Sequence, residues 1–206
     1  MGMIKYLKGL FNNTNLAFEK VELPESFAYI VVEQQKKTFS TDKIKILMIS
    51  DFSEFLDNYT PIFAVNECNK EKMNIQLDIY GQGRDLNKIK TCIKNQNCEN
   101  IQYKGSFQDF HSVFLDYDLF ITSSYSFDAQ IQTIGAMRAG LPLLLMDIKD
   151  NGSCEFICNN GYLIPSNSVL LYYKTLKSIY ENKSHLITMG QNSRNLFEER
   201  YLARRD

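Results

Sequence analysis

The stretch IQLDIYGQGRDLNKIK, residues 75–90, contains a complete strand–turn–helix unit. Its apolar start, Ile75 to Tyr80, has the short length and the isoleucine and tyrosine content of a β-strand. Glycines interrupt the pattern at 81 and 83. The following segment, Asp85 to Lys94, spaces its apolar residues for one face of a helix, with an aspartate able to cap the start. The unit predicts a strand that leads through a glycine turn into an amphipathic helix.

The same alternation continues on both sides of this unit. Further strands are predicted at residues 45–50, 100–104, 119–123, 142–147 and 161–164. Further helices are predicted at residues 106–116, 129–139, 169–180 and 185–202. Because runs such as PLLLMD are apolar at successive positions, we expect strands that are buried on both faces. The sequence therefore predicts an α/β fold: a doubly wound, Rossmann-like, mostly parallel sheet of about six strands with helices on both faces.

Residues 1–42 do not follow this rhythm, and we predict a domain boundary that leaves residues 43–206 as the Rossmann-like domain. The N-terminal segment is expected to hold a short amphipathic helix around Leu7 and a strand at Ala28 to Glu33. The basic face of that helix covers only about one and a half turns, so a packing helix is favoured over contact with a membrane surface.

The composition describes an ordinary globular domain. Of 206 residues, 44% are hydrophobic and 23% charged, which excludes a disordered or collagen-like chain. A net charge of -1 offers no general attraction for nucleic acid or anionic lipid. No apolar run reaches the roughly 18 residues of a membrane span, and the start lacks the pattern of a secretory signal. We therefore expect a cytoplasmic protein that binds no nucleic acid.

The metal-binding and nucleophilic residue types form no recognisable motif. The five cysteines have no CxxC spacing, and His111 and His185 are the two histidines of the sequence. These residues do not assemble a zinc signature, so the cysteines are interpreted as ordinary thiols and no metal is expected. No nucleophile–base pair argues for hydrolysis, and no catalytic residue is assigned.

Ligands of open parallel sheets bind beyond the carboxyl ends of the strands, so the turns at those ends are the candidate sites. Leu86 holds the place of the third glycine in a dinucleotide fingerprint, which makes the glycine turn a weak motif. Turn formation and helix capping are the favoured interpretation of each turn taken alone. The candidate binding residues in these turns are Gly81, Gln82, Gly83 and Arg84, then Lys104 and Gly105, and then Ser123 and Ser124.

Five segments in this order resemble the C-terminal half of a GT-B glycosyltransferase of family 4, also called group 1. They are LDIYGQGRDLNKIK, NIQYKGSF, DYDLFITSS, AMRAGLPLLLMD and CEFICNNGYLIP, and the resemblance covers about residues 44–200. It implies a domain that holds the nucleotide-sugar donor, such as a UDP- or GDP-sugar, without a bound metal or other cofactor. It also implies an acceptor domain supplied from elsewhere, because some 42 preceding residues are too few to form one.

The residues that carry the chemistry of this family are replaced here. By resemblance, its two glutamates fall on Phe127 and Gly135, and Asp128 begins the place of its phosphate-binding glycine turn. Its arginine and lysine after the first strand fall in a stretch that reads SDFSEF, residues 50–55. Acidic groups there repel a diphosphate instead of attracting it. Arg84, Lys104 and Arg138 are the candidate replacements.

Three functions remain open from the sequence. The first is a donor-binding domain that works with a separate acceptor-domain polypeptide. The second is a catalytically inactive module of a glycosylation complex, of the kind used in polysaccharide biosynthesis, which contacts a partner protein or self-associates. The third is an unrelated doubly wound domain that binds a small anion at residues 123–126. Strand order separates the third function from the others, and nucleotide-sugar binding separates the first from the second.

Overall fold

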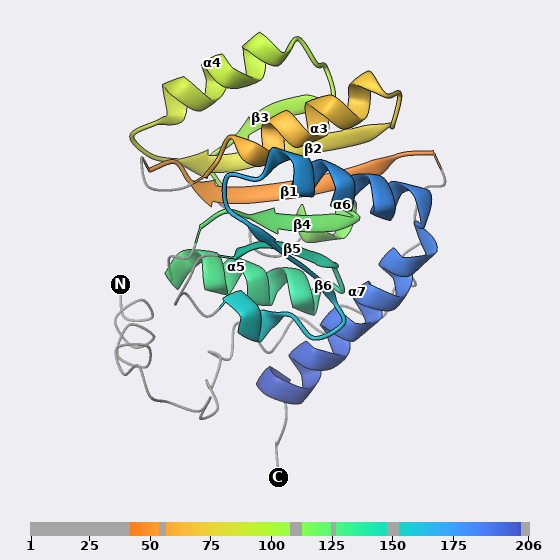
Figure 1. Ribbon diagram of the computed structural model, residues 1–206. Helices are drawn as coiled ribbons and strands as arrows, with labels where there is room; N and C mark the ends of the chain where they lie inside the picture. The colour runs from red at the N-terminus through yellow and green to blue at the C-terminus, as the bar shows by residue number, and fades with distance from the viewer. Residues whose placement is uncertain (1–41, 54–56, 108–112, 125–126, 148–152, 203–206) are drawn as a thin grey trace.

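The computed structural model describes residues 42–53, 57–107, 113–124, 127–147 and 153–202. Six parallel strands form one sheet in the order β3-β2-β1-β4-β5-β6 (Figure 1). The strands are β1 (Ile44–Asp51), β2 (Ile75–Gln82), β3 (Ile101–Gly105), β4 (Leu119–Thr122), β5 (Leu143–Asp147) and β6 (Gly161–Pro165). This order confirms the predicted fold class, and it places the topological switch point between β1 and β4.

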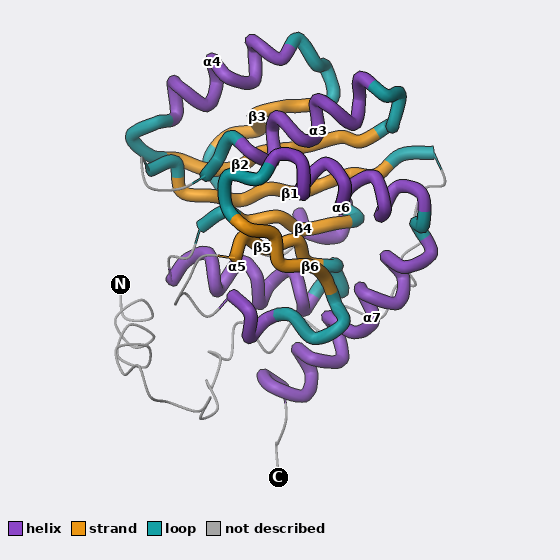
Figure 2. The backbone as a smooth tube through the Cα atoms, viewed as in Figure 1, coloured by secondary structure: helices purple, strands orange, loops and turns teal. Residues whose placement is uncertain are grey.

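Helices cover both faces of the sheet (Figure 2). Helices α3, α4 and α6 lie on one face, and α5 lies on the other, where the later part of α7 joins it. The helices are α3 (Thr60–Lys70), α4 (Leu86–Gln96), α5 (Phe127–Arg138), α6 (Val169–Glu181) and α7 (Ser184–Phe197). Short turns of helix occur at η1 (Val113–Asp116), η2 (Ser153–Phe156) and η3 (Glu198–Leu202).

Strand β1 shows why the sheet has this two-sided cover. Ile46 and Met48 point into the apolar cluster beneath α3 and α6, while Leu47 and Ile49 point into the cluster beneath α5 and α7. All four side chains are at most 1% exposed. Since successive side chains of a strand alternate between faces, a strand that is apolar at every position requires helices on both sides.

Two helical segments differ from the sequence prediction. Ser106 and Phe107 are not helical and residues 108–112 lie outside the described residues, so the prediction of a helix beginning at Ser106 is wrong. Its aromatic spacing still brings two rings together, since the centroids of Phe107 and Phe114 lie 5.9 Å apart. Helix α3 has no counterpart among the predicted elements. The helix around Leu7 and the strand at 28–33 also lie outside the described residues.

Candidate functional site

A buried cluster of uncharged polar side chains lies at the switch point, where β1 and β4 end. The hydroxyls of Ser50 and Ser123 both donate to Asn58 Oδ1, at 2.6 and 2.8 Å, and the two hydroxyl oxygens are 3.0 Å apart. Asn58 Nδ2 donates to the carbonyl oxygen of Asp51 at 3.1 Å. The three side chains are at most 5% exposed. The cluster therefore satisfies its own hydrogen bonds without a ligand.

The glycine turn after β2 packs against the end of β1. A Cβ at Gly81 would collide with the carbonyl oxygen of Ser50 and would lie 2.6 Å from the Phe52 ring, and a Cβ at Gly83 would lie 2.6 Å from the Phe52 carbonyl oxygen. Two backbone bonds fix the contact, from Phe52 N to the Gln82 carbonyl at 3.0 Å and from Asp85 N to the Phe52 carbonyl at 2.9 Å. The close approach that these glycines allow is thus used by Phe52.

Two carboxylates lie at or just beyond the end of β1. Asp51 is the exposed last residue of the strand, in the stretch where the resemblance implies a cation. Asp57 Oδ1 accepts a hydrogen bond from Thr60 N at 3.0 Å, and its Oδ2 accepts one from Asn167 N at 2.6 Å. The N-terminus of a helix attracts anions through its free N–H groups and partial positive charge. At α3 this attraction is directed to a carboxylate of the chain itself.

The negative charge of Asp57 acts on Tyr172, a buried tyrosine on α6. Tyr172 is fully buried, and its hydroxyl has no hydrogen-bond partner among the described residues. Burial raises the pKa of Tyr172, and the negative charge of Asp57 raises it further. The tyrosine is therefore neutral beside this carboxylate and contributes no charge to the edge of the sheet.

The three candidate cations, Arg84, Lys104 and Arg138, lie in different parts of the domain. Arg84 is exposed in the glycine turn at the carboxyl edge. Lys104 Nζ lies 3.9 Å from Oδ2 of the buried Asp78, which also accepts a hydrogen bond from the Tyr117 hydroxyl at 2.9 Å. Arg138 ends α5, a helix of 12 residues and roughly 18 Å, so it lies far from the helix N-terminus at the switch point. Among these three residues, Arg84 lies in the turn at the edge, Lys104 lies at the end of β3, and Arg138 is remote from both.

Asp78 and Tyr117 form a buried pair beside Lys104, whose own side chain stays 37% exposed. Burial raises the pKa of Tyr117, and hydrogen bonds with Tyr80 and Asp78 raise it further, so this hydroxyl stays protonated and donates. Asp78 is 4% exposed and also accepts a hydrogen bond from Gln76 Nε2 at 2.9 Å. The ammonium of Lys104 offsets a buried carboxylate in this arrangement.

The remaining predicted positions lie along α5 and at two strand ends. Phe127 and Asp128 begin α5 beside the switch point, and Ser124 is buried just before them. Gly105 ends β3, and a Cβ there would meet nothing within 4 Å. Gly135 is about two turns into α5, where a Cβ would lie 3.1 Å from the Phe114 ring. A side chain at position 135 would therefore compete with Phe114 for space.

Asn58 and Asp57 belong to the site, but they were not among the predicted residues. They directly precede Tyr59, Thr60 and Pro61. An acidic or amide residue followed by a proline in the first helical turn is a helix-start signal. That signal predicts α3, and with it the capping role of Asp57.

Metal binding and membrane crossing have no support among the described residues. Nowhere in the described ranges do three or more His, Cys, Asp or Glu side chains gather as a metal ion would require. The helices of the described ranges include none with the length and apolarity that crossing a membrane demands.

The strand order, with candidate turns on both sides of the switch point, defines a doubly wound, Rossmann-like domain. The family model described as "Glycosyl transferases group 1" matches residues 32–196. The chain belongs to this glycosyltransferase family, which confirms the resemblance drawn from its motifs.

Two similar proteins are named glycosyltransferases, and each is much longer than the region that matches this chain. The GtfA subunit of the UDP-N-acetylglucosamine–peptide N-acetylglucosaminyltransferase of Streptococcus pneumoniae serotype 4 is 35% identical over 108 residues, covering 51% of this chain and 21% of that protein. The O-antigen biosynthesis glycosyltransferase WbnH of Escherichia coli is 33% identical over 124 residues, covering 59% of this chain and 35% of that protein. The chain thus spans about a fifth to a third of the length of these relatives.

Solved structures agree with the fold. The crystal structure of the pneumococcal O-GlcNAc transferase GtfA in complex with UDP and GlcNAc has a TM-score of 0.68 at 26% identity, covering 77% of this chain and 33% of that one. A crystal structure of a GtfA/B complex has a TM-score of 0.69 at 22% identity, covering 79% of this chain and 34% of that one. The second likeness supports the fold alone.

Proposed function

We propose that this domain serves as a non-catalytic glycosyltransferase-type module in a glycosylation complex, with contact to a partner protein as its task. The observation that carries this proposal is the pair of carboxylates at the end of β1. Asp57 already occupies the N-terminus of α3, and Asp51 is exposed at the same edge. The relative named as a GtfA subunit supports the idea of a partner subunit.

Electrostatics make nucleotide diphosphate binding at this edge unfavourable. A carboxylate about 4 Å from a phosphate charge costs about 4 kcal/mol at an effective dielectric constant near 20. Of the cations considered as replacements, Lys104 faces Asp78 and Arg138 lies at the other end of α5. Arg84 alone offsets only part of the charge of a diphosphate flanked by Asp51 and Asp57.

Donor binding is the second candidate function. It is supported by the switch point at the carboxyl edge and by the relative solved with UDP and GlcNAc. In this alternative, the acceptor side would come from a separate domain or partner. A UDP- or GDP-sugar would contact the edge residues Gly81, Gln82, Gly83, Arg84, Lys104, Gly105, Ser123, Ser124, Phe127 and Asp128, while Gly135 is set back from the edge.

A nucleotide titration separates the two functions. Amide NMR spectra of the full ¹⁵N-labelled chain would be recorded with UDP, GDP, ADP and their common sugar conjugates at millimolar concentration. We expect no shift of the Gly81, Gly83 or Ser123 amides in the wild-type protein. Specific shifts of these amides by one nucleotide would overturn the proposal and establish donor binding.

Charge restoration tests the physical reason. Asp51→Arg replaces an exposed carboxylate by a cation and is expected to raise UDP affinity at least about tenfold, since it removes a repulsion and adds an attraction. Asp51→Asn is the matched control, which removes the repulsion only and should give a smaller gain. Equal UDP binding by the wild type and both variants would contradict the electrostatic argument.

A further inference from the structure

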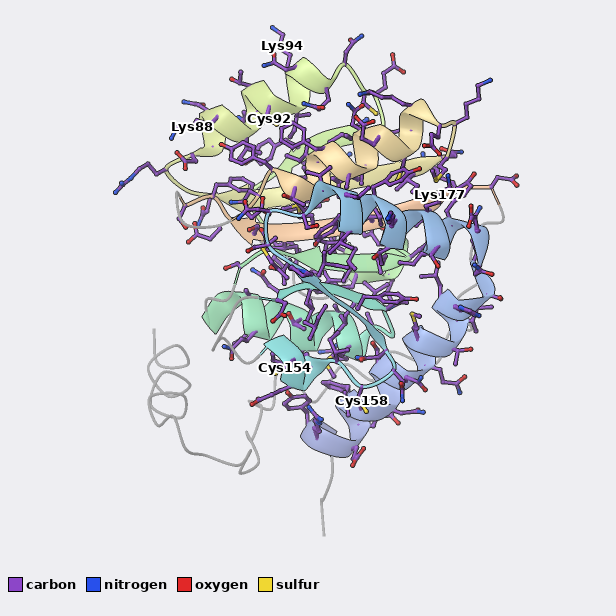
Figure 3. All side chains as sticks on the ribbon, viewed as in Figure 1. Lys88, Cys92, Lys94, Cys154, Cys158 and Lys177 are labelled. Atoms are coloured by element: carbon purple, nitrogen blue, oxygen red, sulfur yellow. The ribbon has the colours of Figure 1, made fainter. Side chains whose placement is uncertain are left out.

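A groove lies between α3 and α4, on the outer side of the sheet. Its volume is about 550 Å³, which is within the usual range for small-molecule sites. Figure 1 shows α4 running beside α3 over the β2–β3 side of the sheet, and Figure 3 shows Cys92 on the side of α4 that faces α3. No residue of the polar cluster at the switch point lines the groove.

The walls of the groove follow helical spacing. Tyr59 and Phe63, four residues apart, form the α3 side, and Phe63 is 38% exposed. On α4, Asn87, Thr91 and Asn95 also recur every four residues, which places them on one face of the helix. One wall is therefore aromatic and the opposite wall carries amides and a hydroxyl.

The surface of the groove is mostly apolar, and its charge is nearly neutral. Lys88, its one charged lining residue, forms an ion pair with Asp85 at 2.8 Å. Burial, and next the charge of Asp85, raise the pKa of Tyr59, which keeps its hydroxyl neutral. No described residue forms a hydrogen bond with the side-chain amide of Asn87 or Asn95. These amides retain both donors and acceptors for a ligand.

We propose that this groove binds a neutral oligosaccharide. The Phe63 and Tyr59 rings would pack against the apolar C–H face of a sugar ring, and the amides of Asn87 and Asn95 would pair with its hydroxyls. An anionic ligand would find Lys88 already neutralised by Asp85, and a purely apolar helix would leave the amides unpaired. The choice of a saccharide rests on the proposed function, because a module of a glycosylation complex works beside glycans.

The test is a titration of the full ¹⁵N-labelled chain with chitotriose and, separately, maltotriose, without any nucleotide. We expect shifts of the amides of residues 59–63 and 87–96 with millimolar affinity. The affinity should be unchanged between about 50 and 500 mM NaCl, because the contacts are uncharged. Phe63→Ala and Asn95→Ala should each weaken binding about fivefold. Lys94→Ala, on α4 but outside the groove, is the matched control and should bind like the wild type.

Several results would overturn the proposal. These are the absence of shifts in the groove with both trisaccharides, equal affinity of Phe63→Ala and the wild type, or binding that disappears at high salt. Shifts confined to the Gly81 and Ser123 amides would also overturn it, since the sugar would then bind at the carboxyl edge. Because the assay contains no nucleotide, a failure here is distinguishable from a failure of the proposed function.

Discussion

The β5–β6 region of the sheet and helix α5 each contain a glycine with a close neighbour, but the neighbours differ. A Cβ at Gly161 would collide with the backbone carbonyl oxygen of Leu143 on the adjacent strand. A Cβ at Gly135 would meet only ring atoms of Phe114, at 3.1 and 3.2 Å. Backbone is far harder to move than a side chain. The sheet therefore requires its glycine, whereas Gly135, where the resemblance implies a glutamate, borders only a side chain that can move.

The end of β1 extends the same comparison. Gly81 and Gly83 keep the close approach that the fold needs, and Phe52 occupies it. Asp51 and Asp57 lie at the end of β1, near the place where the resemblance implies cations, and Asp57 caps the start of α3. In this structure the two glycines thus serve the packing of the turn, and Asp57 serves the start of a helix.

The largest expected effect comes from Gly161→Ala. The added methyl group would force β5 and β6 apart or shift the Leu143 backbone, and we expect a loss of about 3 kcal/mol or more in the free energy of unfolding. Urea denaturation followed by circular dichroism would measure it, with midpoint and slope compared to the wild type.

Gly135→Ala is the matched control for this prediction. An alanine in mid-helix is favoured over glycine by about 0.5–1 kcal/mol, which offsets the small displacement required of Phe114. We expect its stability to stay within about 1 kcal/mol of the wild type. Similar losses in both variants would break the proposed contrast between the two glycines.

The strands were predictable from the sequence because burial on both faces requires a short run of apolar residues, which is visible locally. Residues 75–80 and 142–147 are short apolar runs between turn residues, and the structure places β2 and β5 there. The sequence of helix α3 shows no comparable pattern. Seven of its residues are buried, including Thr60, Asn66 and Cys68, so it lacks the single apolar face that a periodicity search detects.

The chemistry of the edge was only partly predictable. Motif order indicated which turns meet at the switch point, since carboxyl ends of parallel strands share one edge. It did not indicate that Lys104 pairs with Asp78 or that Asn58 links Ser50 to Ser123. Those contacts depend on side-chain directions across different strands, which no local pattern encodes.

A smaller effect is expected for Asn58→Ala, which tests whether the switch-point cluster is a structural element. The change removes the acceptor of both the Ser50 and Ser123 hydroxyls while they remain buried, so we expect a loss of about 2–3 kcal/mol in unfolding free energy. Chemical denaturation measures it. Ser53→Ala, at a partly exposed position just beyond β1, should change stability by less than about 0.5 kcal/mol.

A double-mutant cycle sharpens this test. Ser50→Ala should cost less in the Asn58→Ala background than in the wild type, because the hydroxyl it removes has already lost its acceptor. Additive losses would mean that Asn58 and Ser50 contribute independently, and the cluster would then not act as a unit.

The smallest expected effect lies at the amino edge of the sheet, away from the candidate site. Glu71, which follows α3, accepts hydrogen bonds from the Tyr173 hydroxyl at 2.6 Å and from Lys177 Nζ at 2.9 Å, both on α6. The hydrogen bond from Tyr173, followed by that from Lys177, holds the pKa of Glu71 below its ordinary value.

A carboxyl whose pKa is lowered by folding stabilises the protein above its ordinary pKa, and this contribution disappears as pH falls through the lowered value. Glu71→Gln should therefore lower Tm slightly at pH 7, with a difference that vanishes toward pH 3.

The exposure of this contact keeps the effect small and sensitive to salt. Glu99→Gln, at an exposed glutamate just before β3, is the matched control and should leave Tm unchanged across the same pH range. A Tm difference for Glu71→Gln that stays constant from pH 7 to pH 3 would show that the carboxylate charge does not tie α3 to α6. In that case the Glu71 charge would contribute nothing to stability at the amino edge. Carboxylate charge would then matter only at the carboxyl edge of the sheet.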